Sequence, residues 1–491
     1  MFYIGIDLGT SSVKLLLVDE KGNIHNSISK EYPLSFPNEG WSEQEPNDWW
    51  KETVEGLQEL TEGINTNDIK GIGCGGQMHG LVILDENDEV IRPCILWNDG
   101  RTSKEVDYLN NEIGKRELSE MTANIAFAGF TVPKILWVKE NEPDNFKRIK
   151  KIMLPKDYIN YKLTGKHTTD YSDASGMLLL DVKNKCWSKK MCSICEIEES
   201  LLPELHESFE VIGEVNNDEV SFLNGVEVVA GAGDNAAAAI GTGTIGEGSC
   251  NISLGTSGTI FISSKDFKVD DNNALHSFDH ADGNYHLMGC MLSAASCNKW
   301  FLEEILHTKD YNMEQSSITE DMLGRNNIFF LPYLMGERSP INDTDARGVF
   351  LGMDMHNKRE DMYLALLEGV AFAIRDSLEV AKKLNINIAS SKVCGGGAKS
   401  ELWLKIIANV LNIKLELPLS EEGPGYGGAM LAMVGTKQYK NVENVVNELI
   451  KTKAVIEPDE EIAKRYEERY QKFKKIYPSL KELFKEIKEV N

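Results

Sequence analysis

Alternating hydrophobic and polar residues predict a strand-rich opening that is repeated past the middle of the chain. Apolar runs at 3–6 and 13–18 flank a short turn rich in glycine and hydroxyl residues, which predicts a β-hairpin. The same pattern returns at 251–254 and 259–262, around a second turn of similar sequence. Because the two hairpins stand half a chain length apart, the sequence predicts two similar domains.

The remaining pattern predicts strands and helices in alternation, as in α/β proteins. In chain order, we expect a helix at about 48–61 capped by Asn47, a strand at 69–74, mostly helices over 101–200, a strand at 226–230, a helix at 236–240, a helix at about 358–383, a strand at 391–394, a helix at 400–411 and a charged helical tail over Glu460–Val490, packed on the surface.

The length of 491 residues is too great for one hydrophobic core and suits two domains. We expect an N-terminal domain over 1–245 and a C-terminal domain over 246–491 that ends in the helical tail. Four glycines within 241–248 make this stretch the most hinge-like of the chain and the expected linker.

The composition limits the classes of binding partner that the protein is expected to have. The 42% of hydrophobic residues are spread through the chain, as in a globular protein, and the net charge of −25 argues against nucleic acid or an anionic membrane. No apolar stretch reaches the length of a membrane span, and the first residues carry no basic leader. Nine cysteines do not suggest a disulfide framework, and the Cys192–Cys195 pair has no second pair to complete a metal site. We therefore expect a cytoplasmic protein.

The two hairpin turns are the predicted phosphate-binding loops. Glycine lets backbone N–H groups approach an anion closely, and the hydroxyls that follow add further donors. Ordinary β-turns are the alternative for one copy alone, but two copies at this spacing favour a polyphosphate. The residues concerned are Gly9, Thr10 and Ser11 in the first turn and Gly255, Thr256 and Ser257 in the second.

Two carboxylates are candidates for chemistry. Asp234 follows a predicted strand between small residues, where it could accept a proton from a substrate hydroxyl during phosphoryl transfer. A helix N-cap is an equally common role for such an aspartate. Asp7 directly precedes the first turn, and a carboxylate beside phosphates indicates a divalent cation, here Mg²⁺.

Three further groups could contact ligands. Gly396 and Gly397 lie between a predicted strand and a helix that begins near Ser400, where a flat adenosine could rest on the backbone. A tight packing turn is the alternative. Gln77, Met78 and His79 stand at a strand exit, and Trp97 and Asp99 follow in the same region, a mixture suited to a hydroxyl-rich ligand, although a histidine such as His79 is often purely structural.

Together these motifs resemble the FGGY carbohydrate kinases of the actin-like ATPase superfamily over nearly the whole chain. The stretch 130–137 is similar to the first signature of that family, and 348–352 through 367–369 is similar to the second. The resemblance implies two ribonuclease-H-like domains flanking a deep cleft, ATP and Mg²⁺ as cofactors, a small sugar as substrate, and a possible homodimer.

The resemblance also implies residue roles. Asp234 matches the catalytic base, Asn235 and the pair Met78–His79 match sugar contacts, and Asp7 matches the acidic position near metal and phosphate. The segments 41–44, 77–80, 95–101, 292–296 and 336–338 are most similar to members that phosphorylate D-xylulose. Another ketose or polyol, such as ribulose or glycerol, stays open as substrate, and an ATP-switched scaffold or chaperone is the alternative of another class.

Overall fold

The computed structural model describes residues 1–420 and 422–489 and divides into two compact units. The first comprises Met1–Ile245, Ser277–His286 and Ser420–Ile450, and the second comprises Gly246–His276, Leu287–Leu419 and Lys451–Asn491. The structure thus differs from the predicted continuous second domain, because two segments of residues 246–491 pack with the first unit.

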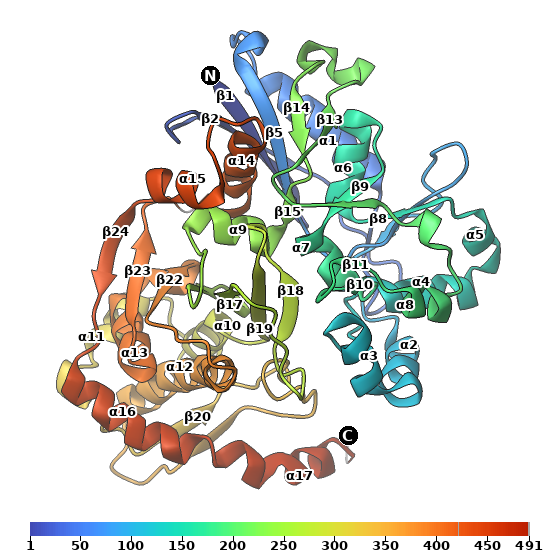
Figure 1. The fold of residues 1–491 in the computed structure, drawn as a ribbon. Helices are drawn as coiled ribbons and strands as arrows, with labels where there is room; N and C mark the ends of the chain where they lie inside the picture. The colour runs from blue at the N-terminus through green and yellow to red at the C-terminus, as the bar shows by residue number, and fades with distance from the viewer. Residues whose placement is uncertain (421, 490–491) are drawn as a thin grey trace. The chain divides into compact units, whose positions relative to one another are not determined.

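The first unit is built on a mixed sheet with the strand order β13-β14-β5-β1-β2-β3, in which β15 also pairs with β5 (Figure 1). Its elements are β1 (Phe2–Leu8), β2 (Ser12–Asp19), β3 (Ile24–Glu31), β4 (Glu43–Gln44), α1 (Pro46–Leu60), β5 (Ile69–Gly76), β6 (Val82–Leu84), β7 (Cys94–Ile95), α2 (Ser103–Asp107), α3 (Lys115–Thr122), α4 (Thr131–Asn141), α5 (Pro143–Arg148), β8 (Lys151–Met153), α6 (Pro155–Thr164), β9 (Thr168–Asp170), α7 (Tyr171–Ala174), β10 (Leu180–Asp181), β11 (Cys186–Trp187), α8 (Lys189–Cys195), β12 (Glu204–His206), β13 (Val211–Glu214), β14 (Glu227–Val229), β15 (Ala232–Gly233), α9 (Asp234–Thr242), α14 (Gly423–Gly435) and α15 (Val442–Leu449).

The first predicted hairpin is formed by β1 and β2. The two strands pair antiparallel from Phe2 opposite Asp19 to Leu8 opposite Val13, which leaves residues 9–11 at the turn. On its other edge β1 runs parallel to β5, so the ends of both strands meet at the same edge of the sheet. The turn and the polar residues that follow β5 are therefore neighbours.

Glycines let α14 pack directly on the sheet. A Cβ atom at Gly5 would lie 1.8 Å from the Gly425 oxygen, and one at Gly73 would lie 2.1 Å from the Gly428 oxygen. Backbone therefore rests on backbone, a contact that no larger residue allows. This packing explains why Ser420–Ile450 belongs to the first unit.

Two local predictions need correction. The expected linker over 241–248 is partly helical, because α9 continues to Thr242 and Gly243 ends it in a left-handed conformation with φ 78°. Gly241 packs inside the first unit, where an added Cβ would meet the Gly423 oxygen at 2.2 Å. At the start of α1 the N-cap is Glu45 rather than Asn47, because Pro46 already occupies the first turn.

The second half of the chain contains a sheet with the order β18-β19-β17-β16-β22-β23-β24. Its elements are β16 (Cys250–Leu254), β17 (Gly258–Ser264), β18 (His276–Asp279), β19 (Tyr285–Met291), α10 (Ala295–Trp300), α11 (Tyr311–Ser316), β20 (Phe329–Leu331), β21 (Val349–Leu351), α12 (Arg359–Lys383), β22 (Ser390–Cys394), α13 (Glu401–Leu411), β23 (Lys414–Pro418), β24 (Thr452–Ile456), α16 (Glu460–Phe473) and α17 (Ile476–Glu489).

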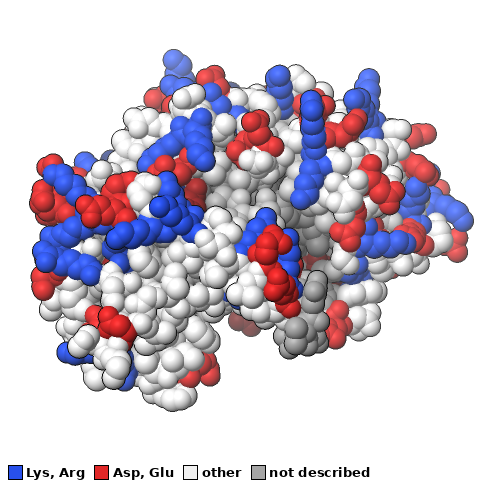
Figure 2. All heavy atoms as spheres, turned by 90° about the horizontal axis from the view of Figure 1, so that it is seen from below, with Lys and Arg blue, Asp and Glu red and all other residues white. Residues whose placement is uncertain are grey.

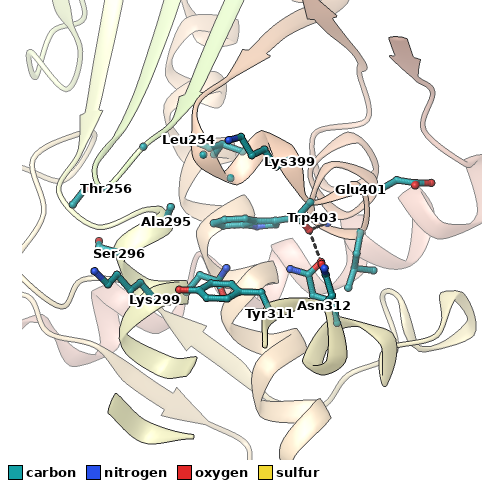
Figure 3. A pocket seen from close by; sticks show the side chains of 17 residues that line it. Leu254, Thr256, Ala295, Ser296, Lys299, Tyr311, Asn312, Lys399, Glu401 and Trp403 are labelled. Atoms are coloured by element: carbon teal, nitrogen blue, oxygen red, sulfur yellow. Dashed lines mark hydrogen bonds between the residues drawn. The ribbon is translucent and has the colours of Figure 1, made fainter. Parts of the chain in front are cut away.

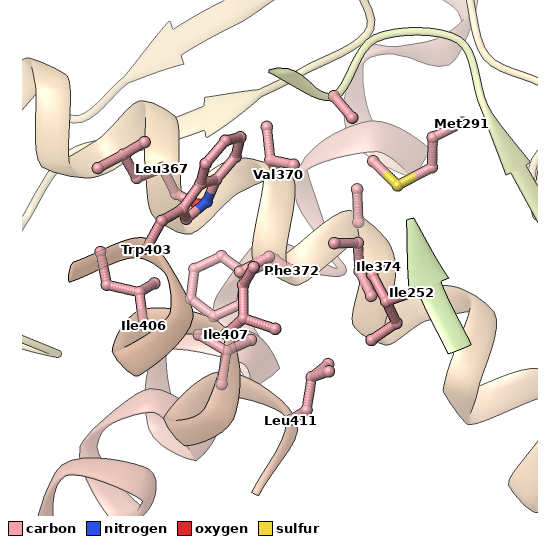
Figure 4. Packing of buried hydrophobic residues seen from close by; sticks show 14 of the residues in the cluster. Ile252, Met291, Leu367, Val370, Phe372, Ile374, Trp403, Ile406, Ile407 and Leu411 are labelled. Atoms are coloured by element: carbon pink, nitrogen blue, oxygen red, sulfur yellow. The ribbon is translucent and has the colours of Figure 1, made fainter. Parts of the chain in front are cut away.

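The hydrophobic core of the second unit joins α12 and α13 to the sheet, as Figure 4 shows for Phe372, Ile407 and Ile252. The predicted charged tail also contributes to this core. Tyr466, Tyr470 and Phe473 of α16 are buried in it, so this helix is part of the unit and not an addition to its surface. The last predicted tail residue, Val490, lies outside the described residues.

Charges and cysteines add little to the choice of function. On the face in Figure 2, basic and acidic side chains lie interspersed. All nine cysteines are free thiols, and burial raises the pKa of Cys192 to about 11. Among the described residues, the structure contains no helix with the length and apolar character needed to cross a membrane.

Candidate active site

The first hairpin turn is held by side chains that are predicted to contact the sugar. The Thr10 hydroxyl donates to Gln77 Oε1 at 3.2 Å and accepts from the Trp97 indole at 3.0 Å. Gln77 is buried, whereas Trp97 is 46% exposed. The backbone N–H of Gly9 donates to the Ser12 oxygen at 3.0 Å, and Ser11 is exposed at the turn. The structure therefore brings the predicted phosphate loop and two predicted sugar residues together.

Asp234 is the first residue of α9, and its side chain is half-buried. The N-cap of this helix is Gly233, so the structure does not support the alternative of Asp234 as the N-cap. The Asp234 Oδ1 atom accepts from the backbone N–H of Asn235 at 2.7 Å and from its amide at 3.0 Å. Burial raises the pKa of Asp234 to about 6. A carboxylate with this pKa is ionised at neutral pH and still able to accept a proton.

Met78 and Asn235 lie against each other beside Asp234. The Asn235 amide is 3.8 Å from the Met78 sulfur. A Cβ atom at Gly233 would lie 2.9 Å from Met78 Cγ and 3.0 Å from its sulfur, so the glycine makes room for the methionine. The predicted base and two predicted sugar contacts thus form one cluster at the start of α9.

His79 is fixed in a defined orientation. Its backbone has φ 70°, an unusual conformation for a residue other than glycine. The Nδ1 atom lies 2.8 Å from the Gly176 carbonyl oxygen, which accepts only, so Nδ1 carries a proton. The ring stacks on Phe130 at a centroid distance of 4.8 Å. These contacts hold the imidazole rigidly beside Met78.

Asp7, the residue predicted to lie near a divalent cation, carries a carboxyl group with a perturbed pKa. Burial raises its pKa to about 7, and the negative charge of Asp234 adds to this effect, while Lys14 lowers it. Lys14 lies opposite Asp7 in the hairpin and pairs with Glu422. Carboxylates that repel each other in a partly buried site fit Mg²⁺, which needs only one or two protein carboxylates beside phosphate and water. Within residues 1–420 and 422–489, no preformed cluster of three or more metal ligands is present.

Asp99 is engaged in a buried ion pair. Its Oδ1 accepts from the Arg101 backbone and Nε, both at 2.9 Å, and its Oδ2 accepts from the Ser42 N–H at 2.6 Å and Arg101 Nη2 at 2.7 Å. The Arg101 guanidinium also lies 3.7 Å from the centroid of the Trp41 ring. These contacts order the loop that carries Trp97, which is how we expect Asp99 to serve the site.

A cavity of about 850 Å³ in the second unit collects most of the other predicted residues (Figure 3). Gly255, Thr256, Gly396, Gly397 and Ser400 line it, whereas Ser257, next in the same turn, does not. The turn is attached to the start of α10, because the Ala294 and Ala295 N–H groups donate to Thr256 and Gly255 oxygens at 3.0 and 2.9 Å. The second hairpin therefore forms one wall of the cavity.

The glycine loop forms another wall. An added Cβ at Gly396 would meet no atom within 4 Å, so this residue presents open backbone. At Gly397 a Cβ would lie 2.8 Å from Leu254 Cβ and 2.9 Å from Trp403, so this residue allows close packing. Ser400 caps α13 and donates to Gln315 Oε1 at 2.7 Å. Gly397 thus fits the alternative of a tight packing turn, whereas contact of Gly396 with a ligand stays a prediction.

Several cavity residues were not predicted from the sequence. Lys299 and Lys399 provide positive charge, and Tyr311 and Trp403 provide aromatic surface, as Figure 3 shows. Lys399 directly follows the glycine loop, so its place in the sequence could have indicated that it lies at the cavity. The others come from helices without a recognisable motif. A cavity with backbone glycines, two lysines and aromatic rings suits a phosphorylated nucleoside.

Comparison with known proteins assigns this two-unit α/β fold to a class. Residues 2–241 match the N-terminal domain of the FGGY family of carbohydrate kinases, and residues 250–436 match its C-terminal domain. The chain belongs to this family and is a carbohydrate kinase.

Within this family, the chain is similar to several individual proteins over nearly its whole length. The chain is 37% identical to a xylulose kinase of Staphylococcus xylosus over 96% of this chain and 98% of that protein. It is also 37% identical to a xylulose kinase of Escherichia coli, over 96% and 97% of the two chains. Among solved structures, a xyloylose kinase from Brucella ovis superimposes with a TM-score of 0.92 at 38% identity, covering 98% of this chain and all of that one.

Proposed function

We propose that the protein transfers the γ-phosphoryl group of ATP to the 5-hydroxyl of D-xylulose, giving D-xylulose 5-phosphate and ADP. The observation that carries this proposal is the cluster at the start of α9, where Asp234, Asn235 and Met78 lie together. A carboxylate, an amide and a flexible apolar side chain are suited to a polyhydroxylated substrate and its deprotonation.

Asp234 acts as the general base. Its Oδ1 is already held by Asn235, which leaves Oδ2 to accept the proton of the attacking hydroxyl. Burial raises the pKa of Asp234 to about 6. The group is therefore ionised at neutral pH, and its pKa is close enough to that pH for it to accept a proton readily. Phosphoryl transfer needs this proton acceptor, accurate positioning and neutralisation of charge rather than covalent catalysis.

Phosphate and metal are assigned to the two hairpin turns and to Asp7. The turns Gly9–Ser11 and Gly255–Ser257 would bind the polyphosphate, the first through the exposed Ser11 rather than through the Gly9 N–H, which donates to Ser12. The cavity lined by Gly396 and Gly397 would take the adenosine. When bound, Mg²⁺ would neutralise the developing charge beside Asp7. Movement of the two units about residues 243–248 would bring their ligands together and exclude water.

D-xylulose is favoured over other sugars because the relatives that cover nearly the full chain are named xylulose kinases. Met78, His79 and Asn235 then contact the ketose, with Gln77 and Trp97 between it and the first turn. Ribulose and glycerol remain the alternatives to be compared in the same assay.

The test is to identify the product. The protein is incubated with ATP, Mg²⁺ and each of a set of ketopentoses and polyols, and the phosphorylated carbon is assigned by ³¹P and ¹³C NMR. We expect phosphate on C5 of D-xylulose, with kcat/KM highest for this sugar. In the same assay Asp234→Asn should lower turnover by roughly two to four powers of ten, the usual size of general-base catalysis. A higher kcat/KM with another substrate, or near-normal turnover of Asp234→Asn, would overturn the substrate or the base, respectively.

A further inference from the structure

A fully buried ammonium group lies behind the proposed base without being part of it. Lys156, at the start of α6, donates to Asp157 Oδ1 at 2.7 Å and lies 3.0 Å from Asp170 Oδ1 and 3.9 Å from Asp173 Oδ2. All four side chains are inaccessible to solvent. Burying one cation and three carboxyl groups costs a large desolvation free energy, so the cluster is a candidate for a functional role.

A chain of hydrogen bonds leads from this cluster to Asp234. Asp170 Oδ2 accepts from the Ser172 hydroxyl at 2.5 Å. The same hydroxyl accepts from the backbone N–H of Gly233 at 3.2 Å. Gly233 is the N-cap of α9, and Asp234 is the next residue. The backbone from which Asp234 projects is therefore tied, through one hydroxyl, to a carboxylate fixed by Lys156.

The same segment reaches the sugar-contacting histidine. The carbonyl oxygen of Gly176, four residues after Ser172, accepts a hydrogen bond from His79 Nδ1 at 2.8 Å. A Cβ atom at Gly176 would lie 2.5 Å from the His79 ring, so the contact is close along the whole edge. Lys156 itself lies under Gly76, where an added Cβ would come within 2.9 Å of Lys156 Cβ. Residues 170–176 thus brace both Asp234 and His79.

Charge within the cluster supports a positioning role. Burial lowers the pKa of Lys156, but Asp157, Asp170 and Asp173 outweigh this effect and keep it charged. Burial raises the pKa of Asp173 well above its usual range, and the charge of Asp234 is among the smaller causes that raise it further. The pKa of Asp173 thus responds to the charge of Asp234, which links the buried cluster electrostatically to the proposed base.

We propose that Ser172, anchored through Asp170 on the buried Lys156, is a positioning residue that fixes the start of α9 so that Asp234 faces the substrate hydroxyl. This inference rests on the proposed function, in which Asp234 is the base. It assigns a role in the reaction to a hydroxyl that does not touch the substrate.

Ser208 offers a matched control. Its hydroxyl donates to the same atom, Asp170 Oδ2, at 2.8 Å, and its side chain is as buried as that of Ser172. No hydrogen bond of the described residues links this hydroxyl to Gly233. Ser172→Ala and Ser208→Ala therefore each remove one donor to the same carboxylate, and only Ser172→Ala removes the link to α9. The Ser172 N–H still donates to Asp170 at 2.9 Å in the variant.

Steady-state kinetics with the proposed sugar and ATP test the inference. We expect Ser172→Ala to lower kcat roughly 10- to 100-fold, the cost of a small misplacement of a reacting group, with KM for ATP unchanged. Ser208→Ala should keep kcat within about twofold, while both variants lower the thermal midpoint alike. Equal kcat in the two variants would overturn the inference. Ser172→Cys, a weaker donor of similar size, should give an intermediate kcat and serves if Ser172→Ala does not fold.

A double-mutant cycle separates this inference from the proposed function. If Ser172 acts through Asp234, Ser172→Ala should not lower the residual turnover of Asp234→Asn any further. An equal fold-loss in both backgrounds would contradict the positioning role while Asp234 remains the base. Wild-type turnover of Asp234→Asn alone would refute the base, and the positioning role with it.

Discussion

Gly233→Ala tests the packing of the proposed sugar site most directly. The added Cβ would lie 2.9 Å from Met78 Cγ, 3.0 Å from its sulfur and 3.1 Å from its terminal methyl carbon. Real Cβ atoms essentially never show a contact below 3.0 Å, and the other two contacts are tighter than most, so Met78 must move. Overpacking of this kind costs about 1–3 kcal/mol. If that cost falls on the sugar-bound state, KM for the sugar rises roughly 5- to 150-fold, since 1.4 kcal/mol corresponds to a factor of ten.

The assay measures initial rates of ADP release while sugar or ATP is varied with the other saturating. We expect a large rise in KM for the sugar and little change in KM for ATP, because the affected atoms belong to the sugar cluster. Gly213→Ala is the matched control, since its Cβ would meet Thr164 and Lys166 only at ordinary distances of 3.5 Å or more. A folded Gly233→Ala protein with an unchanged KM for the sugar would refute the placement of Met78 in the site, as would an equal rise in both KM values.

Three further predictions concern charge and the nucleotide. Because burial raises the pKa of Asp234 to about 6, kcat/KM for the sugar should fall about tenfold per pH unit below pH 6. A pH–rate profile measures this fall, and its absence would contradict the assignment of Asp234 as the base. Since the folded state binds this proton more tightly than the unfolded chain, stability from Asp234 should rise as pH falls from 6 towards 4, and thermal midpoints should show Asp234→Asn losing that rise. Gly396→Ala should raise KM for ATP without changing the thermal midpoint, because its Cβ meets open space, whereas Gly397→Ala should lower the midpoint through its contacts with Leu254 and Trp403. Equal effects of the two glycine variants would exclude a nucleotide resting on Gly396.

Local pattern predicted the elements that a single stretch of chain determines. The hairpins at both turns and the long helix over 359–383 follow from period-two runs around glycine turns and from an extended helical pattern. Small neighbours indicated Asp234, and a place at a strand exit indicated Met78; the structure places both in contact range of Asn235. The assignment of roles to these residues stays a prediction until the variants are measured.

What the sequence did not disclose depends on contacts between distant segments. The glycine-rich stretch at 423–428 begins a helix, because packing against Gly5 and Gly73 outweighs the poor helix propensity of glycine. Nothing in the local sequence around Asp99 indicated that Arg101 would donate hydrogen bonds to both of its carboxylate oxygens. Tyr311 and Gln315 reach the cavity proposed for the nucleotide from a short helix without a motif. The positions of such residues in the site can be seen only in the folded structure.

The return of residues 420–450 to the first unit has a consequence for biosynthesis. β1 and β5 leave the ribosome early, but α14, whose backbone covers Gly5 and Gly73, is made only near the end of translation. Until then the glycine-lined face of the sheet lacks its cover, so the first unit cannot complete its fold before the second unit has been synthesised. A fragment ending at Ile245 should therefore expose apolar surface and aggregate, and adding the segment 420–450 in trans should reduce that aggregation.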